Sequence, residues 1–509
     1  MPLRNVKKNR VTEHYFSFLL LRNSKIHYIC GRKIIEIMAN EIIGREREIG
    51  ILQVCTESDK AEFIAVYGRR RIGKTFLVKQ FYGDNFDFYT SGIYQGSRRD
   101  QLALFNKQLN KYADSVYPIP NTWFEAFDQL EHYITNLKKE KIIIFFDELP
   151  WMDVPRSKFL QALESFWNMF ASTRNNLKLV VCGSATTWIM SKLIGNKGGL
   201  YNRLTCSIKL EQFTLHETEM YLKHAGMGWT RQQIVDCYMV TGGTPYYLSM
   251  LRKDKSAYQN IDDLFFGINA PLRTEYTFLF RSLFNDSTNY RNVVNLLAKR
   301  GQGMTRNEIR QALKMSDGGM LTEILNNLCS CDFVRRYNGF GKKERDVMYQ
   351  LCDLYILFYL HFVAGANHND EHAWSNMIDN PARRAWSGYA FEQVCFTHVP
   401  QLKQALGIAG ILSNVCSWRG RNDDNRAQID MVIDRRDQVI NLCEMKYSLT
   451  PYEIKKEYYQ HLIERQEQFR NETGTRKALM LTMVTSSGIK QNAYSGSIPK
   501  VINLDDLFQ

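Results

Sequence analysis

Three apolar runs in the first half of the chain predict the buried strands of an α/β fold. They are FIAVY from Phe63, KIIIFFDELPWM from Lys141 and NLKLVVCG from Asn176. Parallel strands that are covered on both faces read as continuous apolar runs rather than as alternating patterns. An amphipathic helical pattern follows the first run, so we expect a parallel sheet covered by helices.

The middle of the chain predicts three helices followed by a two-stranded hairpin. The helical pattern starts near Tyr290, and Thr305 with Glu308 forms a capping box for the second helix. The segment FVRRYNGFGKKERDVMYQL, from Phe333, supplies a hairpin around Gly339. This order is that of a winged helix-turn-helix, and the basic hairpin favours contacts with nucleic-acid phosphates. A rigid spacer of the same fold is the alternative.

The last part of the chain predicts a helix, three strands, a second helix and a further strand. The first helix starts at Arg383, a β-hairpin covers residues 428–446, a helix follows from Lys455, and KALMLTMVT from Lys477 is the last strand. This αβββαβ order is that of a nuclease-like core.

A phosphate-binding loop follows the first apolar strand. Gly68 and Gly73-Lys74-Thr75 form the pattern G-x4-GKT between that strand and an amphipathic helix, which is the context this motif requires. Backbone N–H groups would converge on the phosphates, Lys74 would neutralise the β and γ oxygens, and Thr75 would ligate Mg²⁺. The predicted ATP-binding residues are Gly68, Arg69, Arg70, Arg71, Ile72, Gly73, Lys74, Thr75, Phe76, Asp147 and Ser184.

Two carboxylates end the second apolar strand, at the edge where parallel sheets bind ligands. Asp147 would hold Mg²⁺, and Glu148 would polarise the attacking water. The adjacent glutamate indicates hydrolysis rather than binding alone. The alternative is that the two carboxylates cap the next helix.

Two further polar residues follow the third strand. Ser184 would sense the γ-phosphate or else cap a helix. Arg203 would act as an arginine finger or sensor, or else be a solvated surface residue. TGGTPYYLSML, from Thr241, predicts the start of a helical lid, because two glycines end one helix before a proline opens the next.

These motifs, in this order, resemble the archaeal-type ATPases, a branch of the AAA-like and signal-transduction-type P-loop ATPases. The motifs are GREREI near Gly44, GRRRIGKT, IIIFFDELPWM, VVCGSATTWIM, GGLYNR and GGTPYYL. The resemblance covers most of the chain from Met38. It implies a C-terminal domain similar to restriction-endonuclease-like folds, which in this family is mostly of unknown function.

Four C-terminal residues fit the site that such a fold would carry. A nuclease site needs carboxylates on adjacent strands to hold Mg²⁺, a lysine to activate water and often a glutamate from a preceding helix. With the hairpin turn at 436–437, Asp430 pairs next to Glu444, and Lys446 shares a face with Glu444. We expect Glu392, Asp430, Glu444 and Lys446 as catalytic residues, with Asp430 and Glu444 as metal ligands. A nuclease fold used only for binding is the alternative.

The sequence therefore predicts an α/β chain of several domains. A basic extension, which we interpret as untranslated, precedes Met38. The expected parts are the extension at 1–37, a P-loop ATPase core with a parallel sheet at 38–213, a helical lid at 214–285, a winged helix at 286–352, connecting helices at 353–382 and a restriction-endonuclease-like α/β domain at 383–509.

The net charge and the cysteine content indicate which kind of partner and which cellular location to expect. The 66 Lys and Arg against 53 Asp and Glu give a net charge of +13, which favours an anionic partner such as DNA. The scattered cysteines form no Cys-x-x-Cys pair, as in reduced cytoplasmic proteins. No apolar run reaches the ~18 residues of a membrane span.

The sequence predicts an ATPase that binds ATP and Mg²⁺ and couples hydrolysis to DNA binding or cleavage through its last two domains. The alternative is an ATP-switched regulatory or scaffold protein with a catalytically silent nuclease-like domain. The oligomeric state stays open, with a homo-oligomer among the options.

Overall fold

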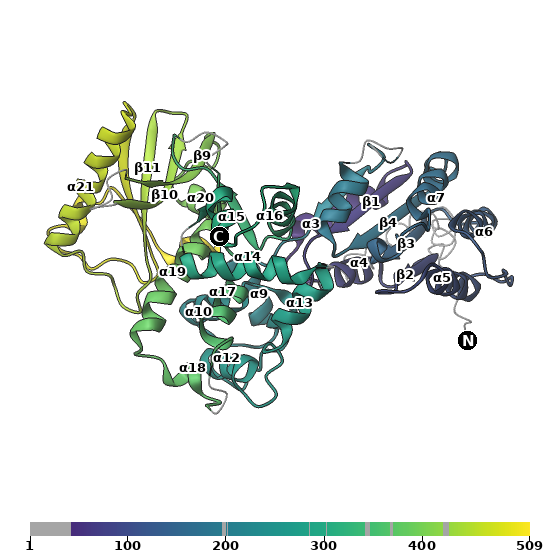
Figure 1. Ribbon diagram of the computed structural model, residues 1–509, viewed down its shortest axis with the longest axis horizontal. Helices are drawn as coiled ribbons and strands as arrows, with labels where there is room; N and C mark the ends of the chain where they lie inside the picture. Colours follow the sequence, from purple (N-terminus) through teal and green to yellow (C-terminus); the bar gives the residue numbers. More distant parts are fainter. Residues whose placement is uncertain are drawn as a thin grey trace, which may run out of the picture. The chain divides into compact units, whose positions relative to one another are not determined.

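The computed structural model describes residues 42–195, 200, 202–284, 286–301, 303–341, 347–366, 370–420 and 427–509. The predicted extension at 1–37 lies outside these ranges, as do the basic hairpin residues Lys342, Lys343 and Arg345. The chain divides into two compact units (Figure 1). Within the described residues, unit 1 comprises 42–64 and 74–182, and unit 2 comprises 65–73 and 183–509.

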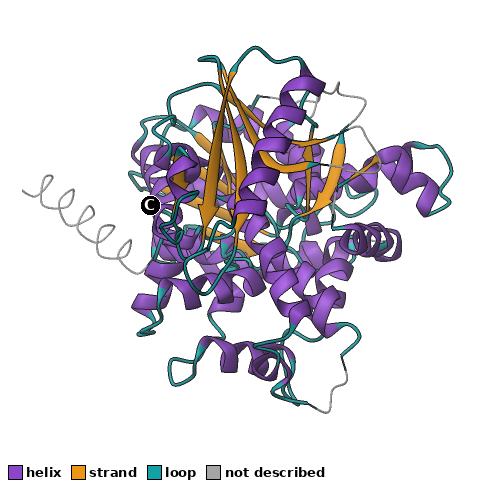
Figure 2. Cartoon of the chain, turned by 90° about the vertical axis from the view of Figure 1, so that its left-hand side faces the viewer, coloured by secondary structure: helices purple, strands orange, loops and turns teal. Residues whose placement is uncertain are grey.

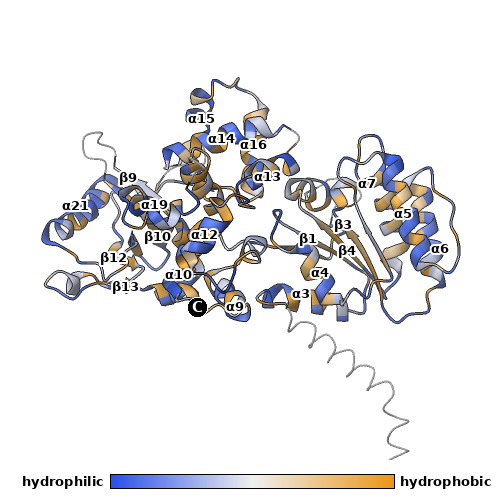
Figure 3. Cartoon of the chain, turned by 90° about the horizontal axis from the view of Figure 1, so that it is seen from below, coloured by the Kyte–Doolittle hydropathy of each residue, from blue (hydrophilic) through white to orange (hydrophobic). Residues whose placement is uncertain are grey.

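The three predicted strands of the first half belong to one five-stranded sheet of order β2-β3-β4-β1-β5. Its strands are β1 (Glu62–Tyr67), β2 (Phe88–Ser91), β3 (Ile142–Asp147), β4 (Leu177–Gly183) and β5 (Cys206–Lys209). The strand pairs β2–β3 and β3–β4 are parallel. Every residue of β3 and β4 is buried, and Figure 3 shows these strands in the hydrophobic colour. This two-sided burial explains why the strands read as continuous apolar runs.

Unit 1 adds the helices that cover this sheet. They are α3 (Glu46–Glu57), α4 (Lys74–Tyr82), α5 (Arg98–Tyr112), α6 (Trp123–Asn136) and α7 (Phe159–Ser165). The hydroxyl groups of Ser97 and Thr122 accept hydrogen bonds from the first turns of α5 and α6, which fixes where both helices begin. Phe88 and Phe146 from the sheet pack against Phe105 of α5, with ring centroids 5.1 and 6.4 Å apart.

Unit 2 begins with a helical region. After the short α8 (Thr186–Trp188), it contains α9 (Leu215–His224), α10 (Arg231–Thr241), α11 (Pro245–Leu248), α12 (Ala257–Phe265) and α13 (Glu275–Leu283). Gly242, at φ 62°, ends α10, and Pro245 opens α11. The predicted break between two helices is thus confirmed.

The next region combines three helices with a small antiparallel sheet. The helices are α14 (Ser287–Arg300), α15 (Arg306–Ala312) and α16 (Gly319–Ser330), and the strands are β6 (Met304–Thr305), β7 (Val334–Tyr337) and β8 (Met348–Leu351). The predicted capping box is confirmed, because Thr305 N donates to Glu308 (2.7 Å) and Glu308 N donates to Thr305 Oγ1 (3.3 Å). The strand β6, which pairs with β8, was not predicted.

The C-terminal region surrounds a second five-stranded sheet, of order β13-β12-β11-β10-β9. Its strands are β9 (Ser413–Arg419), β10 (Gln428–Arg435), β11 (Val439–Lys446), β12 (Ala478–Thr485) and β13 (Lys500–Ile502). Figure 2 shows the strands of this sheet with helices beside it. The helices of the region are α17 (Leu354–Phe358), α18 (Ala373–Asn376), α19 (Pro381–Thr397), α20 (Val399–Ala405) and α21 (Lys456–Thr473). The β9–β10–β11 pairs are antiparallel, whereas β11–β12 is parallel.

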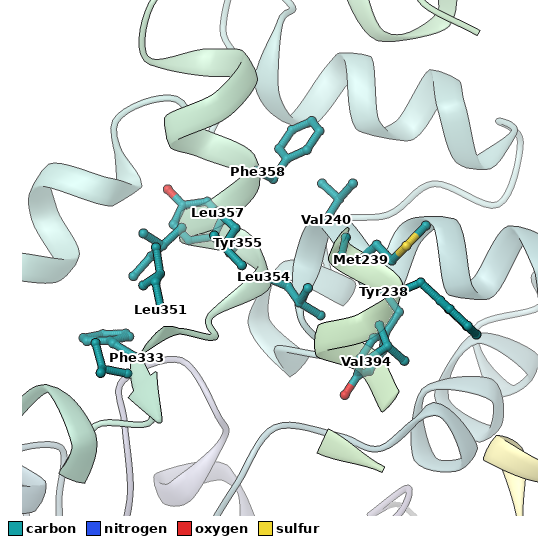
Figure 4. Packing of buried hydrophobic residues seen from close by; sticks show 14 of the residues in the cluster. Tyr238, Met239, Val240, Phe333, Leu351, Leu354, Tyr355, Leu357, Phe358 and Val394 are labelled. Carbon is teal, nitrogen blue, oxygen red and sulfur yellow. The ribbon is translucent and has the colours of Figure 1, made fainter. Parts of the chain in front are cut away.

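One apolar cluster extends through unit 2, from Leu215 in α9 to Phe508 near the C-terminus. Figure 4 shows its centre, where residues 354–358 of α17 pack beside residues 238–240 of α10. A second cluster lies between α21 and the C-terminal sheet. The domain boundaries expected between residues 214 and 509 stay predictions. Within the described ranges, no helix is both long and apolar enough to span a membrane.

Candidate functional site

The phosphate loop connects β1 to α4 through an unusual backbone. Gly68, Arg71 and Gly73 all have positive φ, at 143°, 75° and 86°. A Cβ atom at Gly68 would lie 2.3 Å from the carbonyl oxygen of Leu210, so this position requires glycine. Alternating backbone signs of this kind turn successive N–H groups towards one side of a loop, where an anion can bind.

The predicted magnesium ligands lie together in unit 1. Thr75 Oγ1 is 3.0 and 3.1 Å from the two carboxylate oxygens of Asp147. Asp147 ends β3, is only 5% exposed and accepts a further hydrogen bond from Glu148 N at 2.9 Å. Lys74, at the start of α4, is also only 5% exposed. A hydroxyl group and a carboxylate at hydrogen-bonding distance form the hard oxygen pair that Mg²⁺ prefers, so these residues fit the ion.

Electrostatics at the end of β3 favour a cation. Burial and the neighbouring charge of Glu148 raise the pKa of Asp147 above its usual value. Its negative charge is therefore poorly compensated, and a bound cation would stabilise the ionised form.

Glu148 is held in a strained backbone conformation directly after the strand. Its φ and ψ are 45° and 46°, in the left-handed region that non-glycine residues rarely adopt. A Cβ atom at Gly92 would lie 2.6 Å from the Glu148 carbonyl oxygen, so Gly92 permits this close approach. The turn leaves the side chain partly exposed beside Asp147, as a residue that orients water requires.

Two of the predicted ATP-binding arginines contact protein groups within unit 2. Arg69 is fully buried, forms an ion pair with Asp353, donates to Thr244 Oγ1 at 3.2 Å and lies over the ring of Phe333. The side chain of Arg69 therefore holds the loop to α17 and β7.

Arg71 makes the second of these loop contacts. Its Nε and Nη2 atoms donate to the two carboxylate oxygens of Glu275 in α13, at 3.0 and 3.1 Å. Its guanidinium group also lies 4.0 Å from the ring centroid of Tyr246. Sequence reasoning missed these partners, which lie about 175 to 284 positions away in the chain.

The other predicted nucleotide residues differ in exposure. Ile72 is buried, Arg70 is partly exposed, and Phe76 on α4 is 54% exposed. Ser184 is buried immediately after β4. Arg203 is exposed, which fits both a solvated surface residue and an arginine finger. The roles of Ser184 and Arg203 stay predictions.

The four predicted C-terminal residues lie together. In the β10–β11 hairpin Met431 pairs with Cys443, so the next position of the register sets Asp430 opposite Glu444. Lys446 Nζ donates to Glu444 Oε1 at 2.7 Å. The charges of Asp430 and Glu444 act on the carboxyl group of Glu392, on α19. The hairpin register expected from the sequence is therefore present.

Their charges perturb one another strongly. Burial, followed by the charges of Asp430 and Glu444, raises the pKa of Glu392. Burial and Glu444 likewise raise the pKa of Asp430. Burial also opposes ionisation of Glu444, but Lys446 and Arg465 outweigh it and hold the Glu444 pKa below its usual value. The cluster therefore carries one firmly ionised carboxylate beside two that readily hold protons.

Glu444 already has three partners besides its carboxylate neighbours. Tyr458 OH donates to Oε1 at 2.7 Å, and Arg465 Nη1 donates to Oε2 at 3.1 Å, in addition to Lys446. No group of three or more His, Cys, Asp or Glu in the described ranges has the arrangement of a metal site. Three donors therefore already use most of the roughly four acceptor positions of this carboxylate, and a metal ion would have to share Glu444 with them.

The contacts of Tyr458 and Arg465 with Glu444 were not predicted from the sequence, although the spacing of the two residues along the chain could have indicated them. They are seven positions apart on α21 and so share one face of that helix.

Arg335 of β7 belongs to the basic hairpin that was expected to contact phosphates, but its guanidinium group lies 3.4 Å from the ring centroid of Phe396 on α19. Its Nε also donates to Gln350 Oε1 at 3.1 Å, so protein groups already contact the guanidinium group that was expected to bind phosphate.

Comparison with known proteins defines the class of the first part of the chain. Residues 42–251, which include the loop and the Asp147–Glu148 pair, match the model of a family described as an ATPase domain predominantly from Archaea. This part of the chain is therefore similar to archaeal-type ATPase domains.

Two curated relatives come from Methanocaldococcus jannaschii. The chain is 26% identical over 423 residues to "Uncharacterized protein MJECL04", which covers 82% of this chain and 90% of the relative. It is 44% identical over 39 residues to "Uncharacterized ATP-binding protein MJ0423", and this match covers 8% of this chain and 66% of that protein.

Two solved structures are also similar. The Walker-type ATPase paby2304 of Pyrococcus abyssi is 16% identical and has a TM-score of 0.47. The match covers 64% of this chain and 97% of that protein's chain. The ORC2 protein of Aeropyrum pernix, solved as ADPNP–ADP complexes, is 15% identical, has a TM-score of 0.37 and covers 63% of this chain and 93% of its own.

Proposed function

We propose that this chain is a Mg²⁺-dependent ATPase that uses nucleotide binding and hydrolysis to control a DNA-binding or DNA-cleaving C-terminal region. The observation that carries the first part is the convergence of Thr75 and Asp147 at 3.0 Å, beside a buried Lys74. The match of residues 42–251 to an ATPase family supports the same reaction.

Each residue of the loop and of the Asp147–Glu148 pair has its own role in the proposed hydrolysis. Backbone N–H groups of 68–75 hold the phosphates, Lys74 balances their charge, and Thr75 with Asp147 would hold Mg²⁺. When bound, the ion supplies charge neutralisation at the phosphate oxygens. Glu148 accepts a hydrogen bond from the attacking water and orients it towards the γ-phosphate.

For the region after residue 285, we propose a winged helix followed by a restriction-endonuclease-like domain. The succession of α14, α15 and α16 before the antiparallel β7–β8 pair supports the winged helix. The β9–β10–β11 strands, the helix α21 and the parallel strand β12 support the nuclease-like order. Glu392, Asp430, Glu444 and Lys446 would form its catalytic site.

A specific observation favours the alternative, an ATP-switched scaffold whose nuclease-like domain is silent. The carboxylate of Glu444 is occupied by Lys446, Tyr458 and Arg465. The β7–β8 hairpin also contacts the C-terminal region. Phe340 N donates to Ser417 O of β9 at 2.9 Å, and the ring centroids of Phe340 and Phe469 of α21 are 4.9 Å apart. Both features would keep these surfaces from DNA.

ATP binding by the Lys74→Ala variant tests the nucleotide site. We expect the variant to lose ATP binding in calorimetric titration, because the buried cation that balances the phosphates is gone. The Lys107→Ala variant, at an exposed position on α5 outside the loop, serves as the control and should bind ATP. Normal ATP binding by Lys74→Ala would refute the site.

Plasmid nicking separates the two forms of the proposal. Supercoiled plasmid is incubated with the full chain, Mg²⁺ or Mn²⁺, with and without ATP. Nicking that is lost in Glu444→Ala but kept in Glu457→Ala, an exposed position on α21, would support the nuclease. An intact ATPase without nicking under any condition would support the scaffold.

A further inference from the structure

A cavity of about 720 Å³ lies within unit 2, between α14, the helical segment 354–363 and α19. Its volume falls in the range of small-molecule sites, which is roughly 300–1,000 Å³. The phosphate loop and the C-terminal carboxylates do not line it. Neither the proposed ATPase site nor the proposed nuclease site therefore accounts for this cavity.

The rim of the cavity is cationic. Lys299 and Arg300, in the last turn of α14, are exposed and line it, and His361 lines it as well. None of the described lining residues is acidic. Cations also suit the C-terminus of a helix, so the charge alone does not define a ligand.

The floor is aromatic. Trp386 of α19 lines the cavity and is only 5% exposed, and Tyr389, one turn further along this helix, lines it and is partly exposed. Aromatic side chains offer a large apolar contact area to a bound ring.

The walls are apolar and held in place. Leu357 and Leu360, from the helical segment 354–363, line the cavity together with Tyr389 of α19. Gln350 donates to Tyr389 OH at 3.3 Å and to Gly301 O at 2.8 Å, which ties α19 to the end of α14. The aromatic and aliphatic walls suit a flat ring, and the rim suits a negative charge.

We propose that this cavity is a binding site for a small ligand made of a planar aromatic ring that carries an anionic group. The ring lies against Trp386 and Tyr389, and the anionic group pairs with Lys299 and Arg300. This site is separate from the phosphate loop, and its test does not depend on ATP hydrolysis.

The experiment titrates 1-naphthyl phosphate into the full chain by calorimetry. The Lys74→Ala background excludes the phosphate loop as the binding site of the probe. We expect one saturable site per chain. Lys299→Glu with Arg300→Glu is expected to weaken binding about tenfold or more, since the loss of one charge pair accounts for roughly that factor.

Two further variants distinguish this site from nonspecific binding. Ala385→Trp places a large ring at an exposed lining position and is expected to block the cavity without disturbing the core. Arg384→Glu, an exposed position on the same helix outside the lining, is the matched control and is expected to bind as the parent does. Absence of saturable binding, binding unchanged by Ala385→Trp, or equal loss in Arg384→Glu would overturn the proposal.

Discussion

At the scale of single residues, two arginines of the phosphate loop hold its conformation through ion pairs with other parts of unit 2. Arg69 is buried and paired with Asp353, and Arg71 is paired with Glu275. A buried charge is stable only when it is paired, and an orphaned partner is costly. These arginines therefore make the shape of the loop depend on α13 and α17.

This buried pair can be tested by a double-mutant cycle. Arg69→Met is expected to reduce the free energy of unfolding by about 3–5 kcal/mol, because Asp353 stays buried without its partner. Adding Asp353→Asn, which keeps the cap on Ile356 N, is expected to restore much of that loss. Urea unfolding followed by tryptophan fluorescence measures both values. A double variant that is less stable than the single one would contradict the pairing.

At the scale of elements, a neutral histidine joins two helical regions. His398 Nε2 accepts a hydrogen bond from Leu215 N, at the start of α9, at 2.9 Å, and His398 Nδ1 lies 2.8 Å from Val394 O of α19. Both contacts are met by the neutral ring that donates from Nδ1. Burial lowers the pKa of His398 from 6.5 to about 4.

The pH dependence of stability follows from this shift. Between about pH 6.5 and 4 the unfolded chain binds a proton that the folded chain does not, so stability is present above pH 6.5 and is lost as the pH falls. The loss from this residue is expected to reach about 3 kcal/mol. Urea midpoints across this range should show a flatter profile in His398→Gln. The exposed control His461→Gln should retain the slope, and an unchanged slope in His398→Gln would refute this role.

Local sequence patterns predicted many of the elements because their signals are local. Apolar runs defined β3 and β4, the break at Gly242 and Pro245 separated α10 from α11, and the turn of the last hairpin set the β10–β11 register. The contacts of Arg69, Arg465 and His398 were not predicted. Each depends on a partner that only the folded chain brings near, and burial rather than residue type fixes their roles.

At the scale of the whole molecule, the net charge of +13 and the order of the elements lead to DNA as the proposed partner. Binding that rests on phosphate contacts must weaken steeply with salt, by about 0.9 in log K per contact for each decade of salt. We expect the full chain to bind a nonspecific duplex at low salt, measured by fluorescence anisotropy, and to release it as salt rises. No binding at low salt would favour the scaffold.

The most direct test of ATP hydrolysis is the turnover of ATP by Glu148→Gln compared with the parent chain. Glutamine keeps the size of the side chain but cannot act as a base, so the variant should bind ATP and Mg²⁺ normally. Its hydrolysis rate should fall by about 10²-fold or more, the usual contribution of a positioned base. Phosphate release at the parent rate would contradict the assignment of Glu148 and, with it, the proposed catalytic site.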